Sequence, residues 1–212
     1  SAVEEWTGAG QPVGAWATGG AMNTARRMLG SAGTIDSSLG FGGVSTARDA
    51  ETESYNGTNW TEVNDLTTAR RDTRGCGADN TAALCFGGGS DPSPSTTTLT
   101  ETWNGSNWTE VNDLNTARHN MAGSGLYTAA LSSGGESPTT GKTESWNGTN
   151  WTELNDMNSA RRSLAGAGTN TATLVFGGNT TTIVALTEEW NGASWAEVAD
   201  LSTARVGLGG SG

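Results

Sequence analysis

The sequence is poor in the residues that most catalytic and metal sites need. Its 212 residues include one histidine, His119, and two cysteines. A nucleophilic triad needs a base beside its nucleophile, and a zinc site needs clustered histidine, cysteine or carboxylate ligands. The single histidine has no repeated acid–serine arrangement around it, and there is no histidine pair. We therefore expect no enzymatic activity, no metal and no cofactor.

Basic charge is also scarce. Lys142 is the only lysine, and the formal net charge is −11. Nucleic-acid binding rests on clustered basic residues that neutralise phosphates, so this balance argues against a nucleic-acid partner. No stretch is apolar for eighteen residues, and no basic segment followed by an apolar one opens the chain. We therefore expect no insertion into a membrane.

What the chain has instead is a repeat, rich in glycine and tryptophan. Near-copies of residues 100–118, Thr-Glu-Thr-Trp-Asn-Gly through Asp-Leu-Asn-Thr-Ala-Arg, recur from end to end. Each copy closes on an arginine, at steps of 43 to 48 residues: Arg26, Arg70, Arg118, Arg161 and Arg205. A period of this length indicates one supersecondary unit whose apolar faces are covered by its neighbours.

One unit contains four short strands. In the last complete copy these are residues 163–168, 171–176, 186–190 and 194–198, and none of them has a helical period. Asn191-Gly192 predicts a tight type I′ hairpin turn between the third and fourth strands, because both central residues of that turn need positive φ. Four strands in a unit of this length predict a blade of a β-propeller.

The repeat carries a family resemblance. Phe-Gly-Gly follows the second strand at residues 41–43, 86–88 and 176–178, and Ser-Gly-Gly takes its place at 133–135. The order of arginine, small-residue strand, Phe-Gly-Gly, aromatic residue and Trp-x-Glu resembles the kelch repeat over essentially the whole chain. The tight Trp-Asn-Gly-x-x-Trp spacing is similar to the kelch-like repeats encoded by bacteriophages, marine viruses especially. The resemblance implies a propeller that lies outside the cell or on a virion.

The repeats predict one all-β domain over residues 1–212, a five-bladed propeller with four-stranded blades. The complete units span about 26–69, 70–117, 118–160 and 161–204. The closing blade is split between the two ends of the chain, residues 1–25 and 205–212. This split blade has no Phe-Gly-Gly strand. Either it has three strands, or the chain is a segment of a longer protein, and both alternatives stay open.

The repeated arginines have glutamates in phase with them. Five glutamates stand two residues before the aromatic residue of the third strand: Glu4, Glu53, Glu101, Glu144 and Glu188. We expect each arginine to pair with a glutamate or aspartate between adjacent blades, because its planar guanidinium suits a carboxylate. The alternative is a collar of charges that binds a ligand at the central channel.

A second set of residues follows the repeated arginines directly and is expected at the channel mouth. Four of them can carry positive charge: Arg27, Arg71, His119 and Arg162. They form a candidate site for a carboxylate, sulfate or sialic-acid-like ligand. Alternatively, they are surface groups that balance acidic loops. The loops between the second and third strands vary most among the repeats and are expected on the same face, where binding is usually placed. These variable loops are residues 44–50, 90–98, 136–141 and 179–185.

The two cysteines lie on the first and second strands of one blade. A two-residue turn at Asn80-Thr81 would place Cys76 opposite Cys85, where a cross-strand disulfide is conceivable. The interpretation that we favour is two small buried thiols, because free cysteine is commonly buried.

These observations favour a non-catalytic binding or assembly module. The phage resemblance implies a virion-associated fibre, adhesin or decoration propeller, whose partner is a receptor protein or glycan on a cell or virion surface. One alternative is a lectin with repeated sugar sites between the blades, which would need exposed tryptophans. The other is an intracellular protein-interaction domain, as in many cellular kelch proteins.

Overall fold

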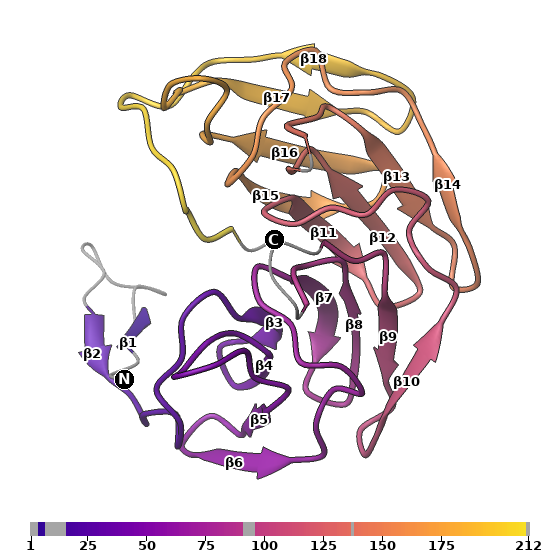
Figure 1. Cartoon of the computed structure of the whole chain (residues 1–212). Helices are drawn as coiled ribbons and strands as arrows, with labels where there is room; N and C mark the ends of the chain where they lie inside the picture. Colours follow the sequence, from indigo (N-terminus) through magenta and orange to yellow (C-terminus); the bar gives the residue numbers. More distant parts are fainter. Residues whose placement is uncertain (1–3, 7–15, 91–95, 137, 211–212) are drawn as a thin grey trace.

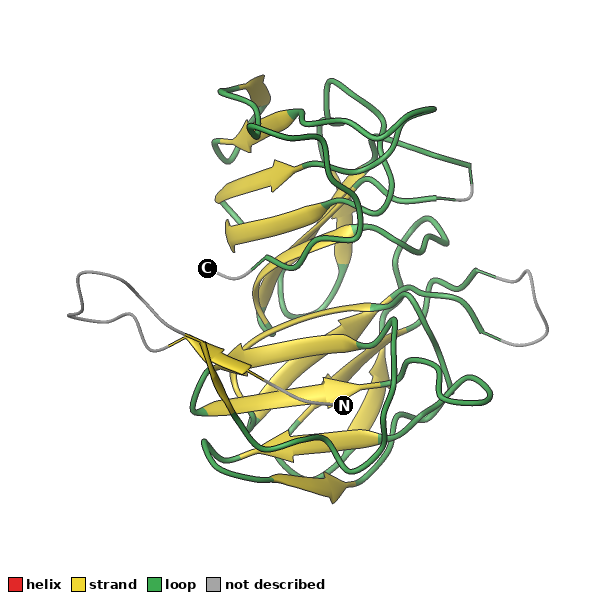
Figure 2. Cartoon of the chain, turned by 90° about the vertical axis from the view of Figure 1, so that its left-hand side faces the viewer, coloured by secondary structure: helices red, strands yellow, loops and turns green. Residues whose placement is uncertain are grey.

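The computed structural model describes residues 4–6, 16–90, 96–136 and 138–210. Every regular element in the described part of the chain is a β-strand (Figure 2). Sixteen of the strands form four sheets of four antiparallel strands each, and β1 and β2 form a separate hairpin. The expected all-β class and the repeated four-stranded unit are therefore confirmed.

Each four-stranded sheet runs in chain order from its first to its fourth strand. The first sheet contains β3 (Gly30–Thr34), β4 (Ser37–Phe41), β5 (Thr52–Tyr55) and β6 (Trp60–Val63). The second contains β7 (Arg74–Asp79), β8 (Ala82–Phe86), β9 (Thr100–Trp103) and β10 (Trp108–Val111). The third contains β11 (Ala122–Leu126), β12 (Ala129–Ser133), β13 (Thr143–Trp146) and β14 (Trp151–Glu153). The fourth contains β15 (Ala165–Thr169), β16 (Ala172–Phe176), β17 (Thr187–Trp190) and β18 (Trp195–Glu197).

The sheets are arranged as an arc of blades. Figure 1 shows them side by side around the segment that leads to the C-terminus, with the first strand of each sheet innermost. The inner strands β3, β7, β11 and β15 contact one another in that order. The arc is open between β15–β18 and the β1–β2 hairpin in the same view.

Glycine on the inner strands makes room for the neighbouring blade. A Cβ atom on Gly75 would lie 2.3 Å from the ring of Phe41, which belongs to the preceding blade. A Cβ atom on Gly123 would lie 2.9 Å from the ring of Phe86 in the same way. Since real Cβ contacts are essentially never this short, the inner strands need glycine where a phenylalanine of the preceding blade packs against them.

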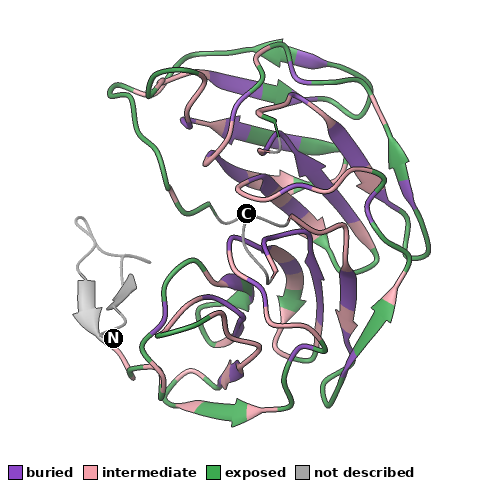
Figure 3. Cartoon of the chain, in the orientation of Figure 1, coloured by how far each residue is buried: buried purple, intermediate pink, exposed green. Residues whose placement is uncertain are grey.

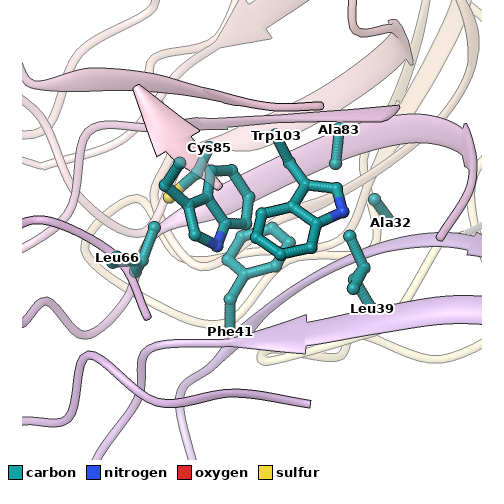
Figure 4. Close-up of a cluster of buried hydrophobic side chains, with 8 residues drawn as sticks. Ala32, Leu39, Phe41, Leu66, Ala83, Cys85 and Trp103 are labelled. Atoms are coloured by element: carbon teal, nitrogen blue, oxygen red, sulfur yellow. The ribbon is translucent and has the colours of Figure 1, made fainter. Parts of the chain in front are cut away.

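The hydrophobic core consists of layers between adjacent blades. Figure 4 shows the layer between the first two sheets, where Leu39 and Phe41 of β4 meet Trp103 of β9. Equivalent clusters join the second sheet to the third and the third to the fourth. Paired tryptophans on the third and fourth strands, such as Trp146 and Trp151 with ring centroids 5.5 Å apart, fill the wider outer part of each layer. Figure 3 shows this burial concentrated on the inner three strands of each blade.

The connection between the third and fourth strands differs from the expected two-residue turn. Trp103 pairs with Trp108, so four residues form the loop. Asn104 does not have positive φ; only Gly105, with φ of 88°, adopts the left-handed conformation. The side-chain Oδ1 atom of Asn104 accepts bonds from the backbone N–H groups of Ser106 and Asn107, at 3.0 and 2.9 Å. Asparagine is therefore used here for its side-chain acceptor rather than for type I′ geometry.

The conceivable disulfide is absent, and both described cysteines are free and buried. A β-bulge between Cys76 and Asp79 shifts the register, so Cys76 faces Leu84 and Cys85 faces Gly75. The bulge adds one residue to β7, which moves the two thiols to different places in the sheet. Burial raises the pKa of both thiols.

The blades are also joined by a repeated tryptophan–threonine bond. The indole Nε1 atom of the fourth-strand tryptophan donates to the Oγ1 atom of a third-strand threonine in the preceding blade. This bond measures 3.0 Å in Trp108–Thr52, Trp151–Thr100 and Trp195–Thr143. Two buried atoms at the ends of the arc, Thr187 Oγ1 and Trp60 Nε1, have no hydrogen-bond partner among the described residues. They are the acceptor of the last blade and the donor of the first.

The two ends of the chain hold parts of a fifth repeat. In the N-terminal hairpin, Trp6 of β1 (Glu4–Trp6) pairs with Trp16 of β2 (Trp16–Thr18), the same register as Trp103 with Trp108. At the other end, the N–H of Gly178 donates to Arg205 O at 2.8 Å, as the N–H of Gly88 does to Arg118 O. Residues 206–210 do not form a strand. The described structure thus holds four complete blades and one two-stranded sheet, and the arc is not closed.

Candidate functional site

The repeated arginines are buried anchors of the links between blades. Arg70 lies between β6 and β7, and its side chain is fully buried. Its NH1 group donates to Gly87 O at 3.0 Å and Leu99 O at 2.8 Å, and its NH2 group lies 2.6 Å from Glu101 Oε1. The same arrangement recurs in Arg26–Glu53, Arg118–Glu144 and Arg161–Glu188.

These pairs fasten a link to the blade that follows it. The three partners of Arg70 lie in the second blade: Gly87 directly after β8, Leu99 directly before β9, and Glu101 in β9. Glu101 also accepts a bond from the N–H of Thr67 at 2.8 Å. The expected arginine–glutamate pairing is therefore present at four of the five arginines, but it joins the link to the blade that follows rather than two adjacent blades. Burial lowers the pKa of Arg118 and Arg161, and Glu144 and Glu188 oppose that shift.

The buried pairs do not form a ligand collar. Arg70, Arg118 and Arg161 are completely inaccessible to solvent, so no ligand in the channel contacts them. The fifth position differs, since Arg205 is exposed. Its expected partner, Glu4, has a side chain that lies outside the described residues.

The residues after these arginines lie beside the variable loops. Isolated antiparallel bridges join Arg27 to Val44, Arg71 to Gly89, His119 to Glu136 and Arg162 to Asn179. Val44, Glu136 and Asn179 are the first residues of three variable loops, and Gly89 directly precedes the fourth. The backbone therefore places the candidate cationic residues and the variable loops on one face. We call this surface the loop face.

The four candidate cations are not gathered into one positive site. Arg71 NH1 lies 3.1 Å from Asp72 Oδ2. Glu136 pairs with both His119, at 3.6 Å, and Arg162. Arg27 is exposed and lines a separate shallow hollow with Arg48 and Arg71. Acidic neighbours thus balance three of the four groups.

A series of backbone hydrogen bonds joins the inner ends of the blades. Met28, Asp72, Asn120 and Ser163 have φ between 52° and 60°, a conformation uncommon for residues other than glycine. The N–H of Asp72 donates to Met28 O, that of Asn120 to Asp72 O, and that of Ser163 to Asn120 O, at 2.7 to 3.2 Å. Gly207 continues the series with a 3.0 Å bond to Ser163 O. The C-terminal segment therefore adds a fifth residue to this series.

A cavity of about 610 Å³ lies beside this series, at the inner strands of the arc. Arg71 and His119 line it, whereas Arg27 and Arg162 do not. The cavity also contains a residue that sequence reasoning missed, Arg74 at the start of β7. The sequence does mark Arg74 as unusual, because the residue four positions after the repeated arginine is small in the other three blades: Gly30, Ala122 and Ala165.

Most of the described tryptophans are packed between blades. Trp103, Trp108, Trp146, Trp151, Trp190 and Trp195 are 1 to 7% exposed. Their faces are covered by neighbouring apolar side chains, so they offer no stacking surface to a sugar ring in the gaps between these blades.

The described part of the chain holds no group of three or more histidine, cysteine, aspartate or glutamate residues placed to bind a metal ion. It also contains no helix of the length and apolar character that a membrane-spanning helix requires.

Comparison with known proteins leaves the kelch resemblance as a prediction from the repeat. No family model matches the chain, and no curated protein sequence matches it. The fold and the geometry of the channel are therefore the observations from which a function is inferred.

Proposed function

We propose that this chain is a non-catalytic binding module, a five-position β-propeller that recognises a protein or glycan through its loop face. The observation that carries the proposal is the set of four bridges between the mouth residues and the variable loops. A constant scaffold that holds different loops side by side is the usual arrangement of a recognition surface. Placement of the module on a virus particle, as a fibre, adhesin or decoration protein, is part of the proposal and rests on the phage resemblance.

The scaffold of this module is a ring closed by the β1–β2 hairpin against the last blade. In the repeat register, Trp16 corresponds to Trp108, Trp151 and Trp195. Closure would let its indole N–H donate to Thr187 Oγ1, which is buried and unpaired in the open arc. Leaving a buried acceptor unpaired costs about 1–3 kcal/mol, so this bond favours the closed ring.

Apolar contacts support the same closure. Leu174 of β16 is 42% exposed, although the corresponding Leu84 and Leu131 are buried at 0% and 1%. Leu201 and Leu208 at the same edge are half-buried. The hairpin carries the tryptophans that cover these positions in the other blades.

A binding panel tests recognition by the loop face. The purified chain is applied to immobilised glycans and to surface proteins of candidate hosts, beside a variant with Arg27, Arg71 and Arg162 changed to alanine. We expect saturable binding that the triple variant reduces by at least tenfold. A variant with the Asn104–Asn107 loop changed to Gly-Ser-Gly-Ser, on the opposite face, serves as the control and keeps its binding.

The lectin alternative predicts a different result for glycan binding by the two variants. Sugar sites between blades would bind glycans equally well in both variants, because neither set of changes touches the gaps. Retention of binding in the triple variant would overturn the loop-face proposal.

A further inference from the structure

Arg74 is an unusual residue for its position. It begins β7, an inner strand, where the equivalent positions hold Gly30, Ala122 and Ala165. Those small residues show that the inner strands do not need a long side chain here. An arginine at this point places a permanent positive charge at the axis, because the guanidinium stays protonated in proteins.

The guanidinium of Arg74 forms few hydrogen bonds with the described residues. Its NH1 group donates to the carbonyl of its own neighbour, Thr73, at 3.2 Å. Among the described residues, no carboxylate forms an ion pair with it. Asp72 is close enough to oppose the lowering of the Arg74 pKa by burial, but the Asp72 carboxylate is already bound to Arg71. Most of the five N–H donors of Arg74 therefore remain for another acceptor.

The surroundings of Arg74 suit a small anion. The cavity of about 610 Å³ lies within the size range of small-molecule sites. Besides Arg74, its lining includes the neutral polar residues Ser31, Asn120 and Ser163. Arg71, His119 and one carboxylate, Asp72, also line it; Asp72 pairs with Arg71, and His119 has Glu136 as its acidic neighbour. Among the described residues, Arg74 is thus the cation in the cavity that has no ion-pair partner.

We propose that this axial cavity binds a small oxyanion, a carboxylate or an inorganic sulfate or phosphate, with Arg74 as its principal ligand. The planar guanidinium makes two parallel bonds to such a group, and the partly dehydrated channel strengthens them relative to bulk water. Asn120 and the serine hydroxyls donate to the remaining oxygens. The site lies inside the channel and does not require the variable loops, so it is independent of partner recognition by the loop face.

Calorimetric titration tests the proposal. Acetate, citrate, sulfate and phosphate are each titrated into the full chain at 0.15 M sodium chloride, which screens the overall negative charge. We expect saturable binding of at least one anion at one site per chain. Acetate and citrate report a preference for carboxylate, and sulfate and phosphate report a preference for a tetrahedral anion.

Matched variants assign the site. Arg74→Ala places at this position the residue that two other blades carry, and it should weaken binding roughly 10- to 100-fold, the effect of losing one charge-assisted interaction. Arg74→Lys keeps the charge without the planar fork and should bind with intermediate affinity. Lys142→Ala removes a positive charge outside the cavity and should bind like the unchanged protein.

Three results would overturn the proposal. These are the absence of saturable binding by all four anions, equal affinity in the unchanged chain and in Arg74→Ala, and an equal loss in Lys142→Ala. Circular dichroism checks that each variant is folded. If Arg74→Ala unfolds, the comparison of Arg74→Lys with Lys142→Ala decides, because a bidentate site distinguishes arginine from lysine. Failure of this titration would leave the partner-binding panel unaffected.

Discussion

The layer between the second and third blades and the outer face of the fourth blade are built from the same repeat but have different surroundings. In the layer between the second and third blades, Leu84 is 0% exposed and Trp146 is 1% exposed. On the outer face of the fourth blade, Leu174 is 42% exposed, Thr187 Oγ1 has no partner among the described residues and Arg205 is exposed. The difference lies in the neighbour rather than in the blade itself. Each blade therefore depends on the next for most of its core, as expected for repeat architectures.

The largest expected effect contrasts the same arginine position in these two places. Arg118→Met would leave Glu144 buried without its cation, and we expect the free energy of unfolding to fall by about 3–5 kcal/mol. Arg205→Met should cost less than about 1 kcal/mol, because Arg205 is exposed and the fifth repeat has no Phe-Gly-Gly strand to cover its guanidinium. Urea unfolding followed by circular dichroism measures both. Equal losses in the two variants would remove the distinction between complete and incomplete positions.

Three tryptophan variants sharpen the comparison at the ends of the arc. Trp108→Phe removes a donor from a bonded pair, and Trp60→Phe removes a donor that has no partner. If the hairpin closes the ring, Trp16→Phe should resemble Trp108→Phe, and both should lose about 1–3 kcal/mol more than Trp60→Phe. The common loss of ring volume largely cancels in this comparison. Thermal or urea unfolding is the measurement, and a Trp16→Phe variant as stable as the unchanged chain would argue against closure.

The smallest expected effect is a gain in stability. Val3 holds the repeat position of Thr52, Thr100, Thr143 and Thr187 and lies outside the described residues. In a closed ring, Val3→Thr would supply a hydroxyl to the unpaired Nε1 atom of Trp60. We expect a gain of about 0.5–1.5 kcal/mol, the usual net contribution of one hydrogen bond. The gain should vanish in the Trp60→Phe background, which isolates the pair as a double-mutant cycle. A gain that persists there would have another cause.

Much of the fold could be predicted because the repeats within the chain can be aligned with one another. Strands 163–168 and 171–176 were expected within two residues of β15 and β16. The four-residue loop after Trp103 was missed because Asn-Gly suits both a type I′ turn and a loop held by the asparagine side chain. The shift between Cys76 and Cys85 was missed because a bulge leaves no mark in residue type alone.

The candidate site could be predicted only in part. The mouth residues follow from the repeat, but whether Arg71 or Arg162 carries a free charge depends on Asp72 and Glu136, whose distances are set by the folded backbone. Arg74 was overlooked because it does not belong to the repeat. A residue that departs from an otherwise constant pattern was the useful signal here, and conserved repeat residues such as Arg118 proved to be buried anchors.

Closure of the ring can be tested most directly by the reactivity of a cysteine at position 174. The native thiols are buried and have raised pKa values, so they should react slowly with iodoacetamide at pH 8 and provide the reference for a protected thiol. In Leu174→Cys, the account predicts labelling by mass spectrometry that is nearly as slow as that of Cys76. The added change Trp16→Ala should accelerate it. Immediate labelling of Leu174→Cys in the otherwise unchanged monomer would show that the last blade stays open and would contradict the closed five-position ring.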